Sequence, residues 1–366
     1  MKKFATGLMA LMLVFASSAF ATIRYVSSTG AGTHTTISAA ANAAVSGDTI
    51  LIGPGTYSDG NINQTNKRLI YIGAGWDQSI VNLTGVWYAN TSGQNGTSWE
   101  GLQVNASSQQ FTFVNNADSI SVRRCLISNT SGSSAPIEAS GARTLTVEDC
   151  IFMNNATTTN APAIFISSAN YPTTIRNCVF VNRGGHSQCR ALTGAAASGT
   201  VELYNSVFLN YTTALNLNAA GGPLIAINNI FYDWTGAGSF GSYNASSVWD
   251  YNSAPASPAV PGTNTTVIST NPFVNYNTTN NYEIGITDLH LDAVNGASLI
   301  NSGHPSLLDF TDGSQSDRGV YGGPKPLVDN GVPNYPWAVN ILLNPNLVGV
   351  GTPVNATALG RVGPQY

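Results

Sequence analysis

Charged residues are scarce in this chain of 366 residues. Asp, Glu, Lys and Arg together make up 9% of it, against roughly 25% in ordinary globular proteins. The 14 basic residues are outnumbered by 18 acidic ones. A sparse and slightly acidic charge offers no electrostatic footprint for nucleic acid or for an anionic membrane surface. We therefore expect no nucleic-acid partner.

Long hydrophobic runs are absent after the N-terminus. Lys2 and Lys3 precede an apolar run from Phe4 to Ala16, and small residues at 19 and 21 form a cleavage motif. The run is shorter than the roughly 20 residues that cross a bilayer. This pattern predicts a signal peptide over residues 1–21, cleaved near Ala21. The mature chain is then secreted (extracellular) or periplasmic, without membrane insertion.

What the chain does have is a ten-residue pattern that occurs five times. Its copies are ISVRRCLISN from Ile120, LTVEDCIFMN from Leu145, TTIRNCVFVN from Thr173, VELYNSVFLN from Val201 and LIAINNIFYD from Leu224. Positions 1 and 3 are mostly apolar and alternate as in a strand, and positions 6 and 8 form a second such pair. The step from position 3 to position 6 breaks the alternation. Two strands therefore meet at a corner formed by positions 4 and 5.

A strand–corner–strand unit of this length cannot bury its apolar face alone. Stacking successive units about 4.8 Å apart buries all of them and places like residues over like. We predict an internal stack of Phe152, Phe180, Phe208 and Phe231, and an amide ladder at a turn formed by Asn129, Asn154, Asn182 and Asn210, with Asp233. The predicted fold is all-β: a right-handed parallel β-helix of about ten coils.

Cysteine is rare, with four residues in the chain. Cys125, Cys150 and Cys178 occupy position 6 of three successive copies. Side chains stacked one strand apart keep their Cβ atoms about 4.8 Å from one another, farther than a disulfide allows. We expect a ladder of buried thiols, with Cys189 as a separate free thiol.

Two further segments carry a resemblance to a known family. Residues 36–57, TISAAANAAVSGDTILIGPGTY, read as a short capping helix with Thr35 or Thr36 as its N-cap, followed by a Gly-Asp turn, a strand and a Pro-Gly turn. Residues 289–324 look like a closing coil. With the repeats between them, these segments resemble secreted right-handed parallel β-helix proteins of the pectate-lyase-like superfamily. The likeness implies the fold and is nearly silent on activity.

The composition changes after Pro326. We assign residues 22–326 to the β-helix and residues 327–366 to a C-terminal tail of short strands separated by Pro and Gly. About forty residues are too few for a separate domain of ordinary size. The tail either packs along the flank of the helix or begins an immunoglobulin-like module. We expect a monomer.

The first candidate site is the column of charges at the corner. Position 4 carries Arg123, Glu148 and Arg176 in three successive copies, and position 5 carries Arg124 and Asp149 in the first two. One interpretation is an exposed ladder of salt bridges, each contributing about 0.2–1 kcal/mol. The other is an arginine–carboxylate site for a sugar.

A second candidate is the loop with Arg183, His186 and Arg190, whose cationic side chains could converge on an anionic sugar. The alternative is an ordinary surface loop between coils. It does not match the Gly-His-Gly signature of hydrolases that share the family's fold.

The third candidate comprises Asp309, Asp312 and Asp317, three carboxylates around a glycine turn. Oxygen ligands of this kind could hold a structural Ca²⁺. The alternative is a turn stabilised by Asx hydrogen bonds. No cofactor is otherwise required.

Aromatic residues gather in the first coils. Trp76, Trp87, Tyr88 and Trp99 are either stacking platforms for sugar rings or packing residues.

Enzymes that resemble this fold cleave acidic polysaccharides with a cation or a basic group, or hydrolyse polysaccharides with paired carboxylates. This chain shows no such cluster on one face, and after the signal peptide its lysines are Lys67 and Lys325 alone. We therefore expect a non-catalytic secreted protein that binds a polysaccharide or a cell-envelope glycan, or serves as a cell-surface structural protein. The alternative is a polysaccharide lyase or glycoside hydrolase acting on an acidic plant or algal polysaccharide.

Overall fold

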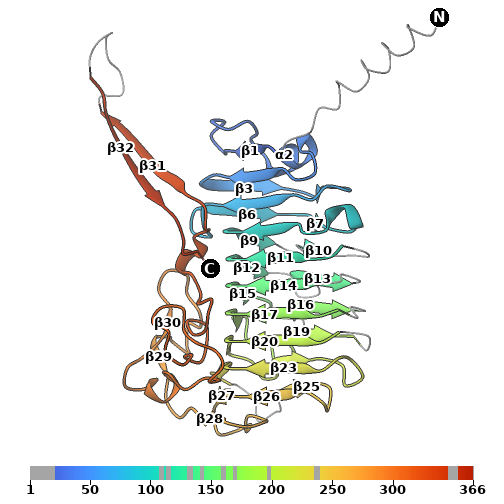
Figure 1. The fold of residues 1–366 in the computed structure, drawn as a ribbon, viewed down its shortest axis with the longest axis vertical. Coiled ribbons are helices and arrows are strands. Elements are labelled where there is room, and N and C mark those ends of the chain that lie inside the picture. The colour runs from blue at the N-terminus through green and yellow to red at the C-terminus, as the bar shows by residue number, and fades with distance from the viewer. Residues whose placement is uncertain are drawn as a thin grey trace, which may run out of the picture.

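The computed structural model describes residues 21–365, except 107–110, 113–116, 130–134, 141–143, 158–161, 168–170, 196–198, 235–239 and 345–352. The predicted signal peptide, apart from Ala21, lies outside the described residues. The described chain stacks short parallel strands into an elongated solenoid. The helix α2 lies at one end, and the C-terminal segments lie along one flank (Figure 1).

Three parallel sheets form the walls of the solenoid. The first has ten strands: β1 (Ile23–Val26), β2 (Thr49–Ile52), β5 (Ile70–Gly73), β8 (Ser98–Glu100), β11 (Ile120–Arg123), β14 (Leu145–Glu148), β17 (Thr173–Arg176), β20 (Val201–Tyr204), β23 (Leu224–Ile227) and β26 (Val248–Asp250). The second also has ten: β3 (Gly55–Asp59), β6 (Ser79–Leu83), β9 (Gln103–Ala106), β12 (Leu126–Asn129), β15 (Ile151–Asn154), β18 (Val179–Asn182), β21 (Val207–Leu209), β24 (Ile230–Tyr232), β27 (Ser253–Ala254) and β28 (Thr266–Val267). The third has eight: β4 (Ile62–Asn63), β7 (Trp87–Tyr88), β10 (Phe111–Thr112), β13 (Ile137–Ser140), β16 (Pro162–Ser167), β19 (Arg190–Gly194), β22 (Leu215–Asn216) and β25 (Gly241–Ser242). The fold is the predicted right-handed parallel β-helix.

The strand register places like residues over like, as the repeat predicts. Phe152, Phe180, Phe208 and Phe231 are register partners in neighbouring strands of the second sheet. Their rings stack inside the solenoid, with centroids 5.0, 5.0 and 4.7 Å apart and planes within 11° of parallel. The predicted aromatic stack is confirmed.

The first coils hold a second aromatic cluster. Trp87 and Trp99 are fully buried, and both contact Tyr71 and Phe111. Of the two interpretations of the tryptophans in this region, packing is therefore the right one for Trp87 and Trp99.

The thiol ladder is confirmed and has an unexpected continuation. Cys125, Cys150, Cys178 and Cys189 are all buried, and none of them is part of a disulfide in the described structure. The same column continues as Ser206, Asn229 and Asn252, all fully buried. Asn229 Nδ2 donates to Asn252 Oδ1 at 2.9 Å, and Asn252 Nδ2 donates to a main-chain carbonyl one coil back at 2.8 Å. The column therefore changes from thiols to amides toward the C-terminal coils. The buried amides of Asn229 and Asn252 are hydrogen-bonded, as buried polar groups usually are.

The predicted amide ladder lies at the turn after the second sheet. Asn129, Asn154 and Asn182 are buried register partners. Asn182 Nδ2 donates to the carbonyl of His186 at 3.0 Å, and Asn210 Nδ2 donates to the carbonyl of Asn182 at 2.8 Å. Both amides thus bind main-chain oxygens: that of Asn182 closes its own turn, and that of Asn210 connects two successive coils.

Position 5 of the repeat adopts the left-handed region of φ. The residues concerned are Arg124, Asp149, Asn177, Asn205, Asn228 and Tyr251, with φ between 45° and 61°. Asn and Asp tolerate this conformation better than other non-glycine residues, which explains why they recur here. The left-handed residue turns the chain from the first sheet into the second.

The N-terminal end of the solenoid is closed by α2 (Ile37–Ala43). Thr36 is its N-cap, and its side chain accepts from the amide of Ala39. Ile37, Ala40 and Ala41 are fully buried against the first coils, as predicted. Within the described residues, no helix has the length and apolar character to cross a membrane.

After β28 the chain turns back along the solenoid. Residues 268–330 include the antiparallel pair β29 (Phe273–Asn275) and β30 (Asp288–Leu291), and the 3₁₀ turns η2 (Ala297–Leu299) and η3 (Asp329–Gly331); another such turn, η1 (Ser92–Gln94), lies in an early coil. Apolar side chains of this return segment pack on the outer face of the second sheet; among the sheet residues are Leu126, Ile151, Val179, Val207 and Ile230. The prediction of a closing coil at residues 289–324 is therefore wrong. That stretch covers a flank, because the second sheet is apolar on both faces.

The tail forms an antiparallel hairpin of β31 (Trp337–Asn344) and β32 (Asn355–Arg361). Trp337 is buried against Leu51 and Ala74, and its ring lies 6.3 Å from that of Tyr25. Arg361 is ion-paired with Asp77 at 2.6 Å. The base of the hairpin is thus attached to the first coils, and the rest projects from the flank (Figure 1).

We predict that Phe180→Ala lowers the free energy of unfolding by about 3–5 kcal/mol, because it removes one ring from the middle of the internal stack. Urea denaturation followed by circular dichroism measures the change. Phe310→Ala is the matched control, since Phe310 is 51% exposed and should change stability by less than about 0.5 kcal/mol. Equal losses in the two variants would contradict the proposed role of the stack.

Candidate functional site

Glu148 is the centre of the corner column. Its carboxylate oxygens lie 3.0 Å from Arg123 Nε, 3.3 Å from Arg176 Nε and 3.3 Å from Lys325 Nζ. The structure thus brings together Arg123, Glu148 and Arg176, as the repeat predicts, and adds Lys325 from the return segment. Three cations therefore surround one carboxylate.

The column forms the ladder of salt bridges that one interpretation expects, but its exposure is uneven: the side chain of Arg123 is 46% exposed and that of Arg176 is 30% exposed. The side chains of Arg124, Asp149 and Glu148 are only 4–6% exposed. Arg124 donates to the carbonyl oxygens of Val332 at 3.2 Å and Pro364 at 3.1 Å. The C-terminal segments therefore cover the corner, which the repeat alone could not reveal.

The corner cluster surrounds a cavity of about 240 Å³. It is lined by Glu100, Arg123, Arg124, Glu148, Asp149, Lys325 and Asn334. Arg124 Nη1 lies 3.1 Å from Glu100, and Arg124 Nε lies 3.7 Å from Asp149. Burial raises the pKa of Asp149 well above its ordinary value, and the nearby Arg124 only partly offsets this. The acidic and basic side chains pair with one another here. We therefore interpret the cluster as a set of ion pairs that stabilises the packing of the C-terminal segments on the solenoid.

The loop with Arg183, His186 and Arg190 lies at a different corner, between β18 of the second sheet and β19 of the third. Arg190 Nη1 donates to the carbonyls of Ser187 and Cys189, at 3.1 and 2.9 Å. Arg183 is exposed, and His186 is partly buried. The structure does not bring this loop together with the corner cluster, and Arg190 is engaged in shaping its own loop.

The three predicted calcium ligands bind main-chain amides instead. Asp309 accepts from the amides of Asp317 and Gly323, Asp317 accepts from Asn301, and Asp312 accepts from Ser314. Among the described residues, no three His, Cys, Asp or Glu side chains are grouped as a metal-ligand set. Asp312 makes the Asx hydrogen bond of the alternative, to the amide two residues on, whereas Asp309 and Asp317 connect segments farther apart in the chain.

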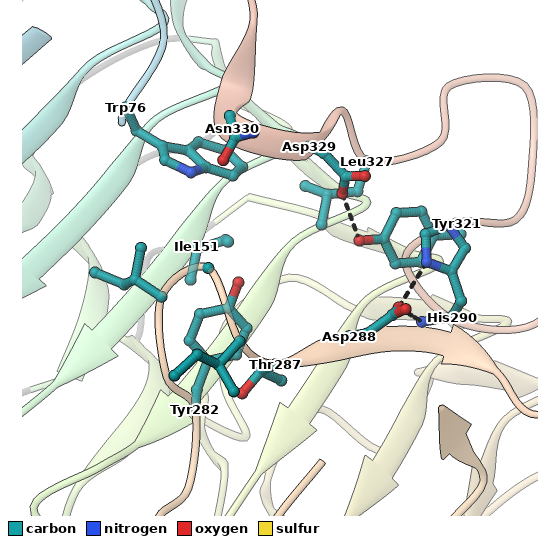
Figure 2. Close-up of a pocket in the computed structure, with 13 residues that line it drawn as sticks. Trp76, Ile151, Tyr282, Thr287, Asp288, His290, Tyr321, Leu327, Asp329 and Asn330 are labelled. Carbon is teal, nitrogen blue, oxygen red and sulfur yellow. Dashed lines mark hydrogen bonds and ion pairs between the residues drawn. The ribbon is translucent and has the colours of Figure 1, made fainter. Parts of the chain in front are cut away.

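A larger pocket, of about 350 Å³, lies between the solenoid and the return segment. We call it the aromatic pocket. Its lining residues are Trp76, Ile151, Tyr282, Ile284, Gly285, Ile286, Thr287, Asp288, His290, Tyr321, Leu327, Asp329 and Asn330. Figure 2 shows Trp76 and Asn330 on one side, Tyr282 opposite, and Tyr321 with His290 on a third side.

Hydrogen bonds hold the polar wall of the aromatic pocket. The His290 ring is stacked on that of Tyr321, with centroids 3.6 Å apart. Asp288 Oδ1 lies 2.7 Å from His290 Nδ1, and the Tyr321 hydroxyl donates to Asp329 Oδ1 at 2.8 Å (Figure 2). The rings and the carboxylates are therefore held in fixed positions relative to one another.

The opposite wall depends on a close fit at η3. The amide of Trp76 donates to the carbonyl of Asn330 at 2.8 Å. Gly331 has φ 57°, and a Cβ there would lie 2.3 Å from the Trp76 ring. A glycine is thus required for η3 to lie against the indole. Trp76 is 4% exposed, so it both packs at a turn and lines the pocket.

Most of this pocket cannot be predicted from the repeat. In the sequence, Trp76 stands out only as one of four aromatic residues, and Tyr282, Asp288, His290 and Tyr321 belong to no recognised motif. The available signal was the alternating LHL of β30, in which His290 is the outward residue between two apolar ones. Pairing that signal with Trp76 needs the return path of the chain, which the repeat does not encode.

No protein-family model matches this chain, and no curated protein matches it. Among solved structures, it is similar to the pectin methylesterase from Aspergillus niger, with 18% identity and a TM-score of 0.38, over 70% of this chain and 92% of that one. A second structure of that enzyme gives 15% identity and a TM-score of 0.36, over 77% and 95% of the two chains. Pectate lyase Pel9A gives 15% identity and a TM-score of 0.35, over 81% of this chain and 95% of that one. The β-helix fold of this chain is shown by its own three stacked parallel sheets.

We predict that Asp149→Asn stabilises the protein at pH 7 by about 1–3 kcal/mol, because it replaces a buried negative charge with a neutral amide of the same shape. Asn also suits the left-handed φ of 53°. A raised pKa in the folded state favours the protonated carboxyl, so wild type loses stability relative to the variant as pH rises above about 4.

Thermal melts of both proteins from pH 4 to pH 8 test this expectation. The difference in melting temperature should be small at pH 4 and should grow with pH. A variant that melts below wild type at pH 7 would show that the ionised carboxylate stabilises the corner through Arg124.

Proposed function

We propose that this protein is a secreted, non-catalytic polysaccharide-binding β-helix protein, and that the aromatic pocket holds one sugar residue of the bound chain. The observation that carries the proposal is the convergence of four rings and two carboxylates on one cavity. The rings belong to Trp76, Tyr282, His290 and Tyr321. Pockets for small ligands commonly measure about 300–1,000 Å³, and this one lies within that range.

The chemistry of the lining suits a sugar ring. The C–H face of a pyranose is apolar and packs on aromatic rings, whereas its hydroxyl groups need hydrogen-bond acceptors and donors at the ring edge. Asp288, Asp329 and Thr287 supply polar groups of both kinds. Ile284 and Ile286, which are 42% and 60% exposed, extend the apolar surface at the outer edge of the pocket.

Binding without cleavage is supported by the state of the acids and bases. In the corner cluster, Glu148 is paired with three cations and Asp149 is buried. In the aromatic pocket, Asp288 is bonded to His290 and Asp329 to Tyr321. The secreted location follows from the predicted signal peptide and remains part of this proposal.

A glycoside hydrolase is the second candidate. One observation favours it: two carboxylates, Asp288 and Asp329, line the same cavity, and glycosidases work with such a pair. The same purified protein distinguishes the two candidates, because only a hydrolase generates new reducing ends.

We predict that mature protein is retarded in gels that contain its polysaccharide, in a panel of pectic, alginate-like and neutral glycans. His290→Ala should weaken binding about tenfold, corresponding to about 1.4 kcal/mol, because it removes the ring stacked on Tyr321. His34→Ala is the matched control, since it deletes a histidine beside β1, outside the lining of the pocket. Reducing ends are measured in parallel.

Equal retardation of the two histidine variants would exclude the aromatic pocket as the binding site. New reducing ends with wild type, lost in Asp288→Asn or Asp329→Asn, would favour the hydrolase. If no glycan is bound or cleaved, a structural role at the cell surface becomes the better description.

A further inference from the structure

The charges that line the aromatic pocket are mainly of one sign. Of the thirteen described residues that line it, Asp288 and Asp329 are acidic, His290 is the one weak base, and none is Lys or Arg. Arg361, which lies beside Gly75 next to Trp76, is ion-paired with Asp77 at 2.6 Å and donates to a main-chain carbonyl. Lys325, two residues before Leu327 of the lining, is likewise ion-paired, with Glu148 at 3.3 Å.

Both carboxylates act on the rings of the pocket. Burial raises the pKa of Tyr282 and of Tyr321, and the negative charges of Asp329 and Asp288 raise both further. The two acids are thus within electrostatic reach of both hydroxyl groups. A ligand between these rings experiences the field of both carboxylates.

Asp288 stays ionised near neutral pH. Burial alone would raise its pKa, but hydrogen bonds from the amide and ring of His290 outweigh burial and lower it. Asp329 accepts from the Tyr321 hydroxyl at 2.8 Å. A carboxylate offers about four acceptor positions, so this single bond leaves Asp329 able to accept from a ligand.

Aromatic faces next to carboxylates favour cations. A cation over the face of Trp or Tyr is attracted by the ring quadrupole, and the attraction grows as water is removed. A uronate would instead bring a third carboxylate into a site without Lys or Arg to receive it. The lining therefore selects against acidic sugars, which is the opposite of the expectation drawn from the fold's resemblance.

We propose that the aromatic pocket recognises a hexosamine residue with a free ammonium group, which pairs with Asp329 and Asp288 between the rings of Tyr282 and Tyr321. This inference rests on the proposed polysaccharide binding and assigns its ligand class. The N-acetylated form of the same sugar lacks the positive charge and binds more weakly. A galacturonate chain, which adds negative charge, binds more weakly still.

Calorimetric titration of the mature protein with three tetrasaccharides tests the assignment: β-1,4-linked glucosamine, its fully N-acetylated counterpart, and galacturonate. We expect the glucosamine tetramer to bind at least about tenfold more tightly than the acetylated one, and galacturonate to bind no more than about a hundredth as tightly. Acetylation changes the charge and keeps the ring, so the first ratio isolates the ammonium group.

Asp329→Asn should reduce the preference for glucosamine about tenfold and leave the affinity for the acetylated tetramer within about threefold. Asp288→Asn should reduce the preference as well, which keeps the test valid if one variant folds poorly. Asp312→Asn removes the same charge from an exposed turn outside the pocket and should behave as wild type.

The outcomes separate the two claims. Equal affinity for the charged and acetylated tetramers would overturn the hexosamine assignment and leave polysaccharide binding intact. Preferred binding of galacturonate would overturn it also. If none of the three tetramers binds, and none of the neutral glycans of the gel panel retards the protein, the proposed polysaccharide binding itself is contradicted.

Discussion

Parallel stacking at the strand separation is the constraint on which the structure depends. Each side chain in a coil lies against its counterpart in the next, so a residue type that fits once is selected again. The phenylalanines satisfy this constraint through ring stacking, and the thiols through size. Farther along the column of the thiols, Asn229 and Asn252 satisfy the same constraint, because one amide donates a hydrogen bond to the other. The apolar second sheet follows the same rule on its outer face and therefore needs a cover.

The return segment supplies that cover, and the corner residues determine its path. The residues with positive φ in successive coils form one row at the corner, and the asparagines among them donate side-chain hydrogen bonds to the return segment. Asn177 donates to the carbonyls of Val320 and Gly322, and Asn205 donates to that of Asp317. The return segment thus runs along the row, and the aromatic pocket forms where it meets Trp76. The candidate site is a product of two surfaces far apart in sequence.

The repeat was sufficient to predict the parallel coils, the phenylalanine stack and the thiol ladder, because each depends on positions 23–28 residues apart. It also placed Arg123, Glu148 and Arg176 side by side. It could not predict the burial of Glu148 and Arg124, since Lys325 and Val332 come from outside the repeat. The role of Asp288 and His290 in the pocket could not be predicted for the same reason, because they lie near Trp76 only through the return path of the chain.

The return segment also changes how the solenoid can come apart. A stack whose coils touch only their neighbours can open from an end, one unit at a time. Here Arg318 donates to the carbonyl of Asn252 in a late coil, and Trp337 lies against Leu51 in an early one. The return segment and the hairpin together thus connect the two ends of the solenoid. Their contacts must break before either end can open, so we expect the solenoid to unfold as a single cooperative unit.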